Sequence, residues 1–170
     1  MAFVTTFVST KDGLSSNAYN IDFSVGPGAR GNLPEDIMLV QAILRIVHFE
    51  VSKPVKPPPG DSSIEVDGEL GPQTIRFILN AQRRAKASNL KVLLDGVFDP
   101  FRAQGQVSTI AKVRYVFEVL NDTAFVLCKQ DGIDNYNNLP SRQDIPAALR
   151  AALSGPQRAV ARKYDEQLQH

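Results

Sequence analysis

The sequence is poor in the residue types on which redox and metal chemistry depend. It contains one cysteine and two histidines in 170 residues, and it has no tryptophan. A single cysteine excludes an internal disulfide, and the apolar run AFVLC around Cys128 predicts a buried, unreactive thiol. His48 and the terminal His170 are too few for a histidine-based metal centre, and any Cys-His or Ser-His-Asp site would have to use one of them.

An excess of charge of one sign is also lacking. Nineteen Lys and Arg residues face eighteen Asp and Glu residues, which leaves a net charge of +1. A dedicated nucleic-acid surface is therefore not expected. The 43% hydrophobic and 22% charged content is ordinary for a globular domain, and the length predicts one domain or one domain with extensions.

Long hydrophobic runs are absent from the sequence. No run approaches the length of a membrane span, so membrane insertion is not expected. Residues 1–9 are too few and too polar for the core of a signal peptide. We therefore expect a protein that is cytoplasmic as synthesised and that would need a signal-peptide-independent route to reach the periplasm or the exterior.

Motifs for catalysis or cofactor binding are not found either. Acidic residues are plentiful, but no apolar motif singles out one of them for a raised pKa. The acidic segment at Asp131 and Asp134 does not match a calcium loop, because Arg142 stands where a bidentate Glu is needed. The sequence thus predicts a protein that is not an enzyme, with no catalytic residue, no metal site and no cofactor.

The best-specified segment runs from residue 64 to residue 84. Asp67-Gly68 is a turn pair, and Gly71-Pro72 is a second break in the chain, with Pro72 suited to the first position of a helix. The residues that then recur at helical spacing are Ile75, Ile78, Leu79 and Gln82. The segment therefore predicts a turn followed by an amphipathic helix.

A second helix is predicted before this segment. Asn32 is placed to cap it, Glu35 is the reciprocal partner of the cap, and Pro34 suits its first turn. The helix continues to about residue 49 and is apolar on most sides. Because such a helix is buried on most sides, we expect the N-terminal and C-terminal parts of the chain to help cover it.

The remaining elements are predicted from shorter patterns. Residues 3–8 and the alternating residues 19–25 indicate an N-terminal hairpin, with an extended arm as the alternative. Ser108 is placed to cap a helix up to about residue 121, although the same residues also alternate as in a strand. Residues 123–129 form a short apolar segment for which a strand is one interpretation, and the sequence leaves helix or strand open over residues 110–128. A last helix is predicted over residues 145–153. The candidate caps of that helix are Ser141 and Asp144.

The D-G-x-L-G-P-x-T pattern of residues 67–74 resembles the signature of peptidoglycan-binding-like domains. Phe77-Ile78 and Ala81-Gln82 stand where that family has its Ala-Val and Phe-Gln pairs, and Val40-Gln41 is similar to its first helix. The pair Asp95-Gly96 echoes Asp67-Gly68, either as a divergent half-repeat or only as a similar turn, and we favour the second explanation. Thr109-Ile110 likewise echoes Thr74-Ile75.

The resemblance implies a mainly α (α+β) fold. It consists of a peptidoglycan-binding-like helical bundle at residues 31–127, an N-terminal hairpin or arm at 1–30, and a C-terminal loop and helical extension at 128–170. It also implies a non-catalytic module that binds peptidoglycan. The alternative is a protein-interaction, structural or adaptor subunit of a phage-like or contractile secretion apparatus, so the partner is peptidoglycan or a protein, and the oligomeric state stays open.

The candidate ligand-binding residues lie on the outward face of the 72–84 helix. Arg76, Asn80 and Arg83 share the side opposite Ile75, Ile78 and Leu79, and guanidinium and amide groups could bind the carboxylates and amides of a muropeptide. Asp67 is a fourth candidate, although it is first of all a turn former. A solvated helix face is the competing interpretation of the outward residues, since exposed charge on helices is the default.

Overall fold

The computed structural model describes residues 1–8, 15–102 and 114–158. Ser108 and Thr109-Ile110 lie outside these residues. The elements are β1 (Phe3–Val8), β2 (Ser15–Asn20), α1 (Pro34–Arg45), the π-helical turn η1 (Ile46–Glu50), α2 (Pro72–Ala87), α3 (Val116–Asp131), the 3-10 turn η2 (Leu139–Ser141) and α4 (Ala147–Leu153). The fold is mainly helical with a small antiparallel hairpin, as predicted. None of the helices within the described ranges is long and apolar enough to cross a membrane.

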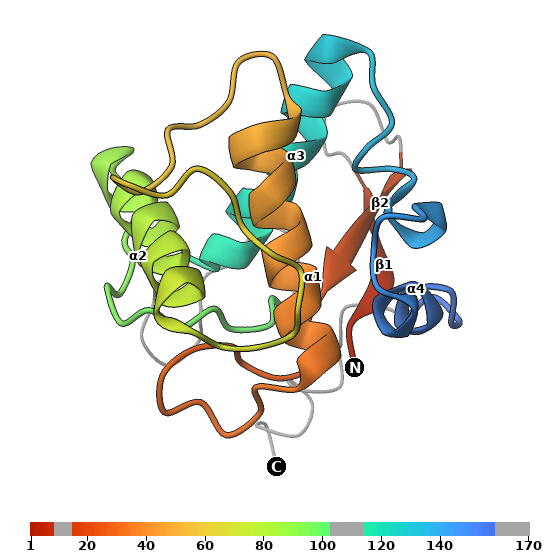
Figure 1. Ribbon diagram of the computed structural model, residues 1–170, viewed down its shortest axis with the longest axis horizontal. Coiled ribbons are helices and arrows are strands. Elements are labelled where there is room, and N and C mark those ends of the chain that lie inside the picture. The colour runs from red at the N-terminus through yellow and green to blue at the C-terminus, as the bar shows by residue number, and fades with distance from the viewer. Residues whose placement is uncertain (9–14, 103–113, 159–170) are drawn as a thin grey trace.

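Helix α1 runs through the middle of the molecule, between α2 on one side and the hairpin and α4 on the other (Figure 1). Pro34 begins it, as expected from the fixed φ of proline. Its buried apolar residues point in most directions and are Ile37, Leu39, Val40, Ala42, Ile43 and Leu44. The helix packs on α3 and α4, while the hairpin packs on those same two helices. The C-terminal part therefore helps to cover α1, as predicted.

The start of α1 differs from the prediction. Asn32 lies at φ 48° and does not cap the helix, because its amide accepts a hydrogen bond from Gly26 N (2.8 Å) and donates to Gly26 O (2.9 Å) and Ala29 O (3.2 Å). The residue at the cap position is Leu33, which has no side-chain capping bond. The predicted capping box of Asn32 and Glu35 is therefore wrong: Asn32 closes the preceding glycine-rich loop instead.

The strand predicted over residues 19–25 ends at Asn20. Asp36, which is fully buried in α1, accepts hydrogen bonds from Asp22 N (3.2 Å) and Phe23 N (3.1 Å). These two amides therefore bond a helix side chain instead of a neighbouring strand. Beyond them, Val25 alone forms an isolated β-bridge, and its partner is Phe98.

Residues 123–129 are helical, which decides between the helix and the strand that the sequence left open there. They belong to α3, which buries a residue at every fourth position, namely Val116, Leu120, Ala124 and Cys128. This spacing places the four side chains on one helix face towards the core, and Cys128 is buried as expected. Gly132, at φ 66°, ends the helix in the left-handed conformation that glycine adopts at little cost.

The start of α4 also differs from the prediction, because neither Ser141 nor Asp144 caps it. Asp144 instead accepts from Arg142 (2.7 Å) and Arg45 (3.0 Å), and Arg142 also donates to Glu50 (2.6 Å). Burial opposes the ionisation of Glu50, but the hydrogen bonds from Arg142 and Asn135 outweigh it and lower the pKa of this carboxyl. This network fastens the C-terminal segment to the end of α1 and η1.

Candidate functional site

The Asp67-Gly68 pair forms a turn that is held by a glutamine of α1. The Gln41 side-chain oxygen accepts from Asp67 N (3.0 Å) and Gly68 N (2.9 Å), and its amide donates to the Asp67 carboxylate (2.8 Å), Glu69 O (3.1 Å) and the Thr74 hydroxyl (3.1 Å). Gln41 is only 2% exposed. The conspicuous polar residues of the motif thus fix the fold, and we call this turn, residues 67–69, the first turn.

Residues 95–97 form a second turn with the same arrangement, held by a glutamine of α2. The Gln82 oxygen accepts from Gly96 N (2.9 Å), and its amide donates to the Asp95 carboxylate (2.9 Å) and Val97 O (2.9 Å). In each turn the Asp carboxylate also accepts from the backbone N–H two residues later, at Glu69 (2.9 Å) and Val97 (3.0 Å). The shared geometry favours the half-repeat over the explanation that we preferred from the sequence.

The predicted ligand-binding residues of α2 hold a neighbouring segment. Arg76 binds both carboxylate oxygens of Asp61 (2.9 and 3.1 Å), which lowers the pKa of Asp61. Asn80 donates to Lys56 O at 3.2 Å. The two side chains therefore fasten the proline-rich segment 51–63 along α2. Arg83 is exposed, and within the described residues it makes no ion pair or side-chain hydrogen bond.

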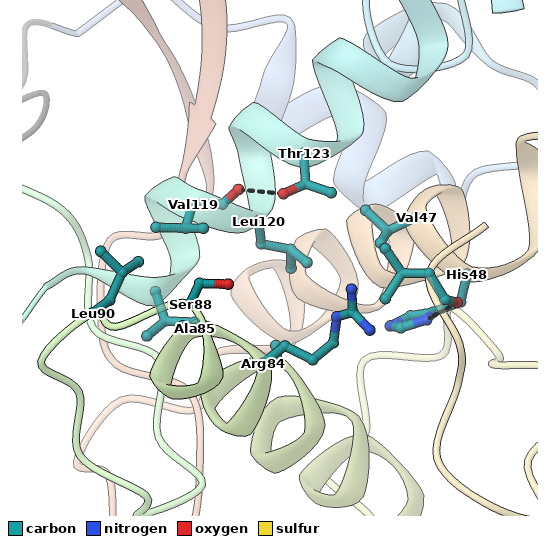
Figure 2. A pocket seen from close by; sticks show the side chains of 12 residues that line it. Val47, His48, Arg84, Ala85, Ser88, Leu90, Val119, Leu120 and Thr123 are labelled. Carbon is teal, nitrogen blue, oxygen red and sulfur yellow. Dashed lines mark hydrogen bonds between the residues drawn. The ribbon is translucent and has the colours of Figure 1, made fainter. Parts of the chain in front are cut away.

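A pocket with a volume of about 140 Å³ opens where η1, α2 and α3 meet (Figure 2). Its wall is mostly apolar and includes Val47 from η1, Ala85 from α2, and Val119 and Leu120 from α3. Its polar lining residues are His48, Arg84, Ser88 and Thr123. We call this feature the α2–α3 pocket. The four ligand-binding residues predicted from the sequence lie outside its lining.

His48 gives the pocket a buried hydrogen-bond acceptor. The turn η1 carries the ring inward, where it is 3% exposed and packs edge-on against Phe77 at 5.2 Å. Its Nδ1 lies 2.8 Å from Val55 O, and Nε2 has no partner among the described residues. Since a carbonyl oxygen only accepts, Nδ1 carries the proton of the neutral ring and Nε2 presents a lone pair.

The environment keeps this ring neutral. Burial lowers the pKa of His48 below its ordinary value, and the positive charge of Arg84 lowers it further, while the hydrogen bond to Val55 acts in the opposite direction. Transfer of a charged imidazolium into an apolar surrounding is unfavourable. The pocket therefore contains an acceptor, and not a second cation, at neutral pH.

Arg84 supplies a positive charge and hydrogen-bond donors to the same pocket. Its side chain extends from α2 across the pocket towards the His48 ring (Figure 2). The residue is exposed, and in the part of the chain that the structure describes it makes no ion pair. The Thr123 hydroxyl, by contrast, already donates to Val119 O at 2.8 Å. A bound group that offers an anion to Arg84 and a donor to His48 would complement both.

The sequence selected neither His48 nor Arg84 as a ligand-binding residue. The signal that could have found Arg84 is its position three residues after the buried Ala81 and next to the buried Ala85. This spacing places Arg84 at the exposed edge of the buried face of α2, whereas Arg83 belongs to the outward face. As for metals, the described residues contain no cluster of three or more His, Cys, Asp or Glu side chains that could hold an ion.

Comparison of the chain with protein-family models, with curated proteins and with solved structures finds no match in any of the three. What the chain binds is therefore inferred from its own residues.

Proposed function

We propose that the chain is a non-catalytic module that binds peptidoglycan, the glycan-peptide of the bacterial cell wall. The observation that carries this proposal is the α2–α3 pocket, in which an apolar wall surrounds the unpaired Nε2 of His48 and the guanidinium of Arg84. Peptidoglycan stem peptides offer the complementary groups, since they carry carboxylates, amide N–H groups and small apolar side chains. Concave apolar sites with a few convergent polar groups are typical of ligand binding.

The glutamine-held turns support the same proposal through the fold. Gln41 and Gln82 belong to the residue pairs that resemble the family motifs, and both bind an Asp-Gly turn. A peptidoglycan-binding-like helical bundle, with the hairpin and the C-terminal segment as additions, accounts for this pattern. Fold alone does not determine a ligand, so the pocket has to be tested directly.

The surface residues take different parts in this proposal. Arg84 binds the ligand in the pocket, and Arg83 contacts the more extended glycan-peptide outside it. Arg76 and Asn80 contribute through the segment 51–63 that they hold against α2. Asp67 contributes through the first turn, because its carboxylate is already bonded to Gln41.

Pelleting of the purified protein with isolated sacculi tests the proposal. The wild-type protein should be retained at low salt, and Arg84→Ala should release most of it because an arginine–carboxylate pair is lost. Arg83→Ala should release less, and the charge-matched control Arg30→Ala, at an exposed arginine outside α2 and segment 51–63, should be retained like the wild type. Absence of retention of the wild type at low salt contradicts the proposal.

A second candidate function is that of an interaction or adaptor subunit of a phage-like or contractile secretion apparatus. The observation that favours it is the exposed apolar pair Leu93 and Leu94, at 53% and 44% exposure. Adjacent exposed leucines are a feature of surfaces that bind other proteins. Co-purification from the native host should then yield a stable protein partner, and Leu93→Ser with Leu94→Ser should lose it. A protein that runs alone and monomeric there contradicts this candidate.

A further inference from the structure

The α2–α3 pocket places three chemical requirements on whatever fills it. His48 Nε2 is buried without a partner among the described residues, and a buried acceptor without a hydrogen bond is unfavourable. It therefore requires an N–H or O–H donor. Arg84 requires an acceptor and prefers an anion with two oxygens, because the guanidinium fork matches a carboxylate. The side chains of Val119 and Leu120 require an apolar group.

The volume of the pocket limits the size of the bound group. Pockets for drug-sized ligands measure roughly 300–1,000 Å³, whereas this one measures about 140 Å³. One small amino-acid residue can be enclosed in such a space, and a hexose ring with its substituents cannot be enclosed in full. The pocket is therefore suited to the peptide part of a glycan-peptide.

We propose that the α2–α3 pocket binds the carboxyl-terminal residue of a peptide that ends in a small apolar side chain. The amide N–H of that residue donates to His48 Nε2, its carboxylate pairs with Arg84, and its side chain packs on Val119 and Leu120. The N–H and the carboxylate are attached to one Cα atom, so they reach the neighbouring His48 and Arg84 together (Figure 2). The identification of the source as a cell-wall stem peptide rests on the proposed function, while the chemistry rests on the pocket itself.

Related small molecules satisfy the pocket less well. A free amino acid carries an ammonium group, which would be desolvated in an apolar wall and placed near the charge of Arg84. A peptide that ends in a carboxamide retains the N–H for His48 but offers Arg84 no anion.

Calorimetric titration with short acetylated dipeptides tests the proposal. The probes are acetyl-D-Ala-D-Ala, acetyl-L-Ala-L-Ala and the carboxamide of each one. At least one of the two acids should bind, and its carboxamide should bind at least about tenfold more weakly because a charge-assisted pair is lost. Arg84→Ala should reduce the affinity for the acid by a similar factor, whereas Arg30→Ala, at an exposed arginine outside α2, should leave it within about twofold.

A resonance of the His48 ring provides a second measurement that a general loss of structure would not imitate. When the acid is added, the resonance of Nε2 should shift from the value of a nitrogen with a free lone pair towards that of a nitrogen that accepts a hydrogen bond. Nδ1 should stay protonated. Equal affinity for acid and carboxamide, or an unchanged Nε2 resonance at saturation, overturns the proposal. The comparison of the acid with its carboxamide uses the unaltered protein, so it does not depend on the folding of any variant.

The two proposals fail separately. If sacculi retain the protein but neither dipeptide acid binds, the pocket proposal is overturned and peptidoglycan binding stands. If a dipeptide acid binds through Arg84 but sacculi do not retain the protein, peptidoglycan binding is overturned and the pocket takes another peptide terminus. Preference for the D-dipeptide supports the cell wall as the source, and preference for the L-dipeptide supports the carboxyl terminus of a protein.

Discussion

The first turn (residues 67–69) and the second turn (residues 95–97) are built in the same way and lead to different structures. A buried glutamine from the preceding helix holds each of them, and their glycines have almost the same backbone angle, with φ +76° at Gly68 and +73° at Gly96. After the first turn the chain enters α2 at Pro72. After the second turn it pairs with Val25 through Phe98 instead.

The difference lies in what each turn contacts beyond its own residues. Thr74, near the start of α2, accepts a hydrogen bond from Gln41, which also holds residues 67–69. The first turn and the start of α2 are therefore bonded to the same glutamine. At the second turn, Phe98 exchanges two backbone hydrogen bonds with Val25 (2.8 and 2.9 Å), and Asp99 accepts from the Ser24 hydroxyl (2.6 Å). The same local device thus starts a helix in one place and joins two loops in the other.

The largest expected effect is the loss of the two glutamines. Gln41 makes five hydrogen bonds and Gln82 makes three. Gln41→Ala should therefore lower the free energy of unfolding by about 3 kcal/mol and Gln82→Ala by about 2 kcal/mol, because buried groups lose their partners. Urea denaturation measures both values, with the exposed Gln143→Ala as the control. A larger loss for Gln82→Ala would show that the first turn is not the more strongly bonded one.

Replacement of the two glycines should also destabilise the protein more at the first turn than at the second. A Cβ atom at Gly68 would lie 2.9 Å from Met38 Cε and 3.2 Å from Pro34 O, whereas at Gly96 the nearest atom is Ile75 Cγ2 at 3.4 Å. Both positions have positive φ, which disfavours alanine by about 1–2 kcal/mol. Gly68→Ala should therefore destabilise the protein by about 2 kcal/mol and Gly96→Ala by about 1 kcal/mol. Thermal unfolding of the two variants checks this order, and equal losses would contradict it.

Thr74→Val tests the hydrogen bond between Gln41 and the Thr74 hydroxyl, which joins the first turn to the start of α2. The buried hydroxyl is replaced by a methyl group of similar size, so Gln41 loses one acceptor and the free energy of unfolding should fall by about 1 kcal/mol. The same substitution in the Gln41→Ala background should have a smaller effect, since the partner has already been removed. Full additivity in a double-mutant cycle would mean that the turn and the helix start are independent.

The smallest expected effect is that of pH on the stability of the protein, through His48 in the pocket. The pKa of folded His48 lies below the ordinary value of 6.5, so near this pH the unfolded chain binds a proton that the folded chain does not. Stability should therefore decrease as the pH falls through 6.5, and it should be fully recovered above this value. His48→Asn, which can still donate to Val55 O, should have a shallower pH dependence between 7.5 and 5.5 in chemical denaturation. An unchanged slope would contradict the assignment of this effect to His48.

The sequence predicted the elements that depend on local chemistry. Residues 3–8 form a strand, Pro34 and Pro72 each begin a helix, and Asp67-Gly68 turns, as expected. Each of these depends on a backbone preference that a residue keeps in any surrounding. The predictions that failed involve polar side chains with more than one possible partner. Asn32 and Asp144 were expected to cap helices, but each of them found partners elsewhere that only the folded chain places within reach.

The candidate site was less accessible to sequence reasoning than the fold. Arg76, Asn80 and Arg83 share the outward face of α2, as the helical spacing predicts, but the spacing could not show that segment 51–63 occupies Arg76 and Asn80. The pocket escaped prediction because it brings together η1, α2 and α3, which are far apart in the chain. Its two polar groups come from different elements, so no local motif connects them.

The sequence by itself determined the composition of the core, the two Asp-Gly turns and a secondary structure that consists mainly of helices. These follow from hydrophobic periodicity and from the backbone preferences of Gly and Pro, which act over a few neighbouring residues. The tertiary structure alone decided which glutamine holds which turn, and it alone placed His48 and Arg84 at one pocket. Hydrogen bonds and burial depend on distances between segments, and those distances exist only after the chain has folded.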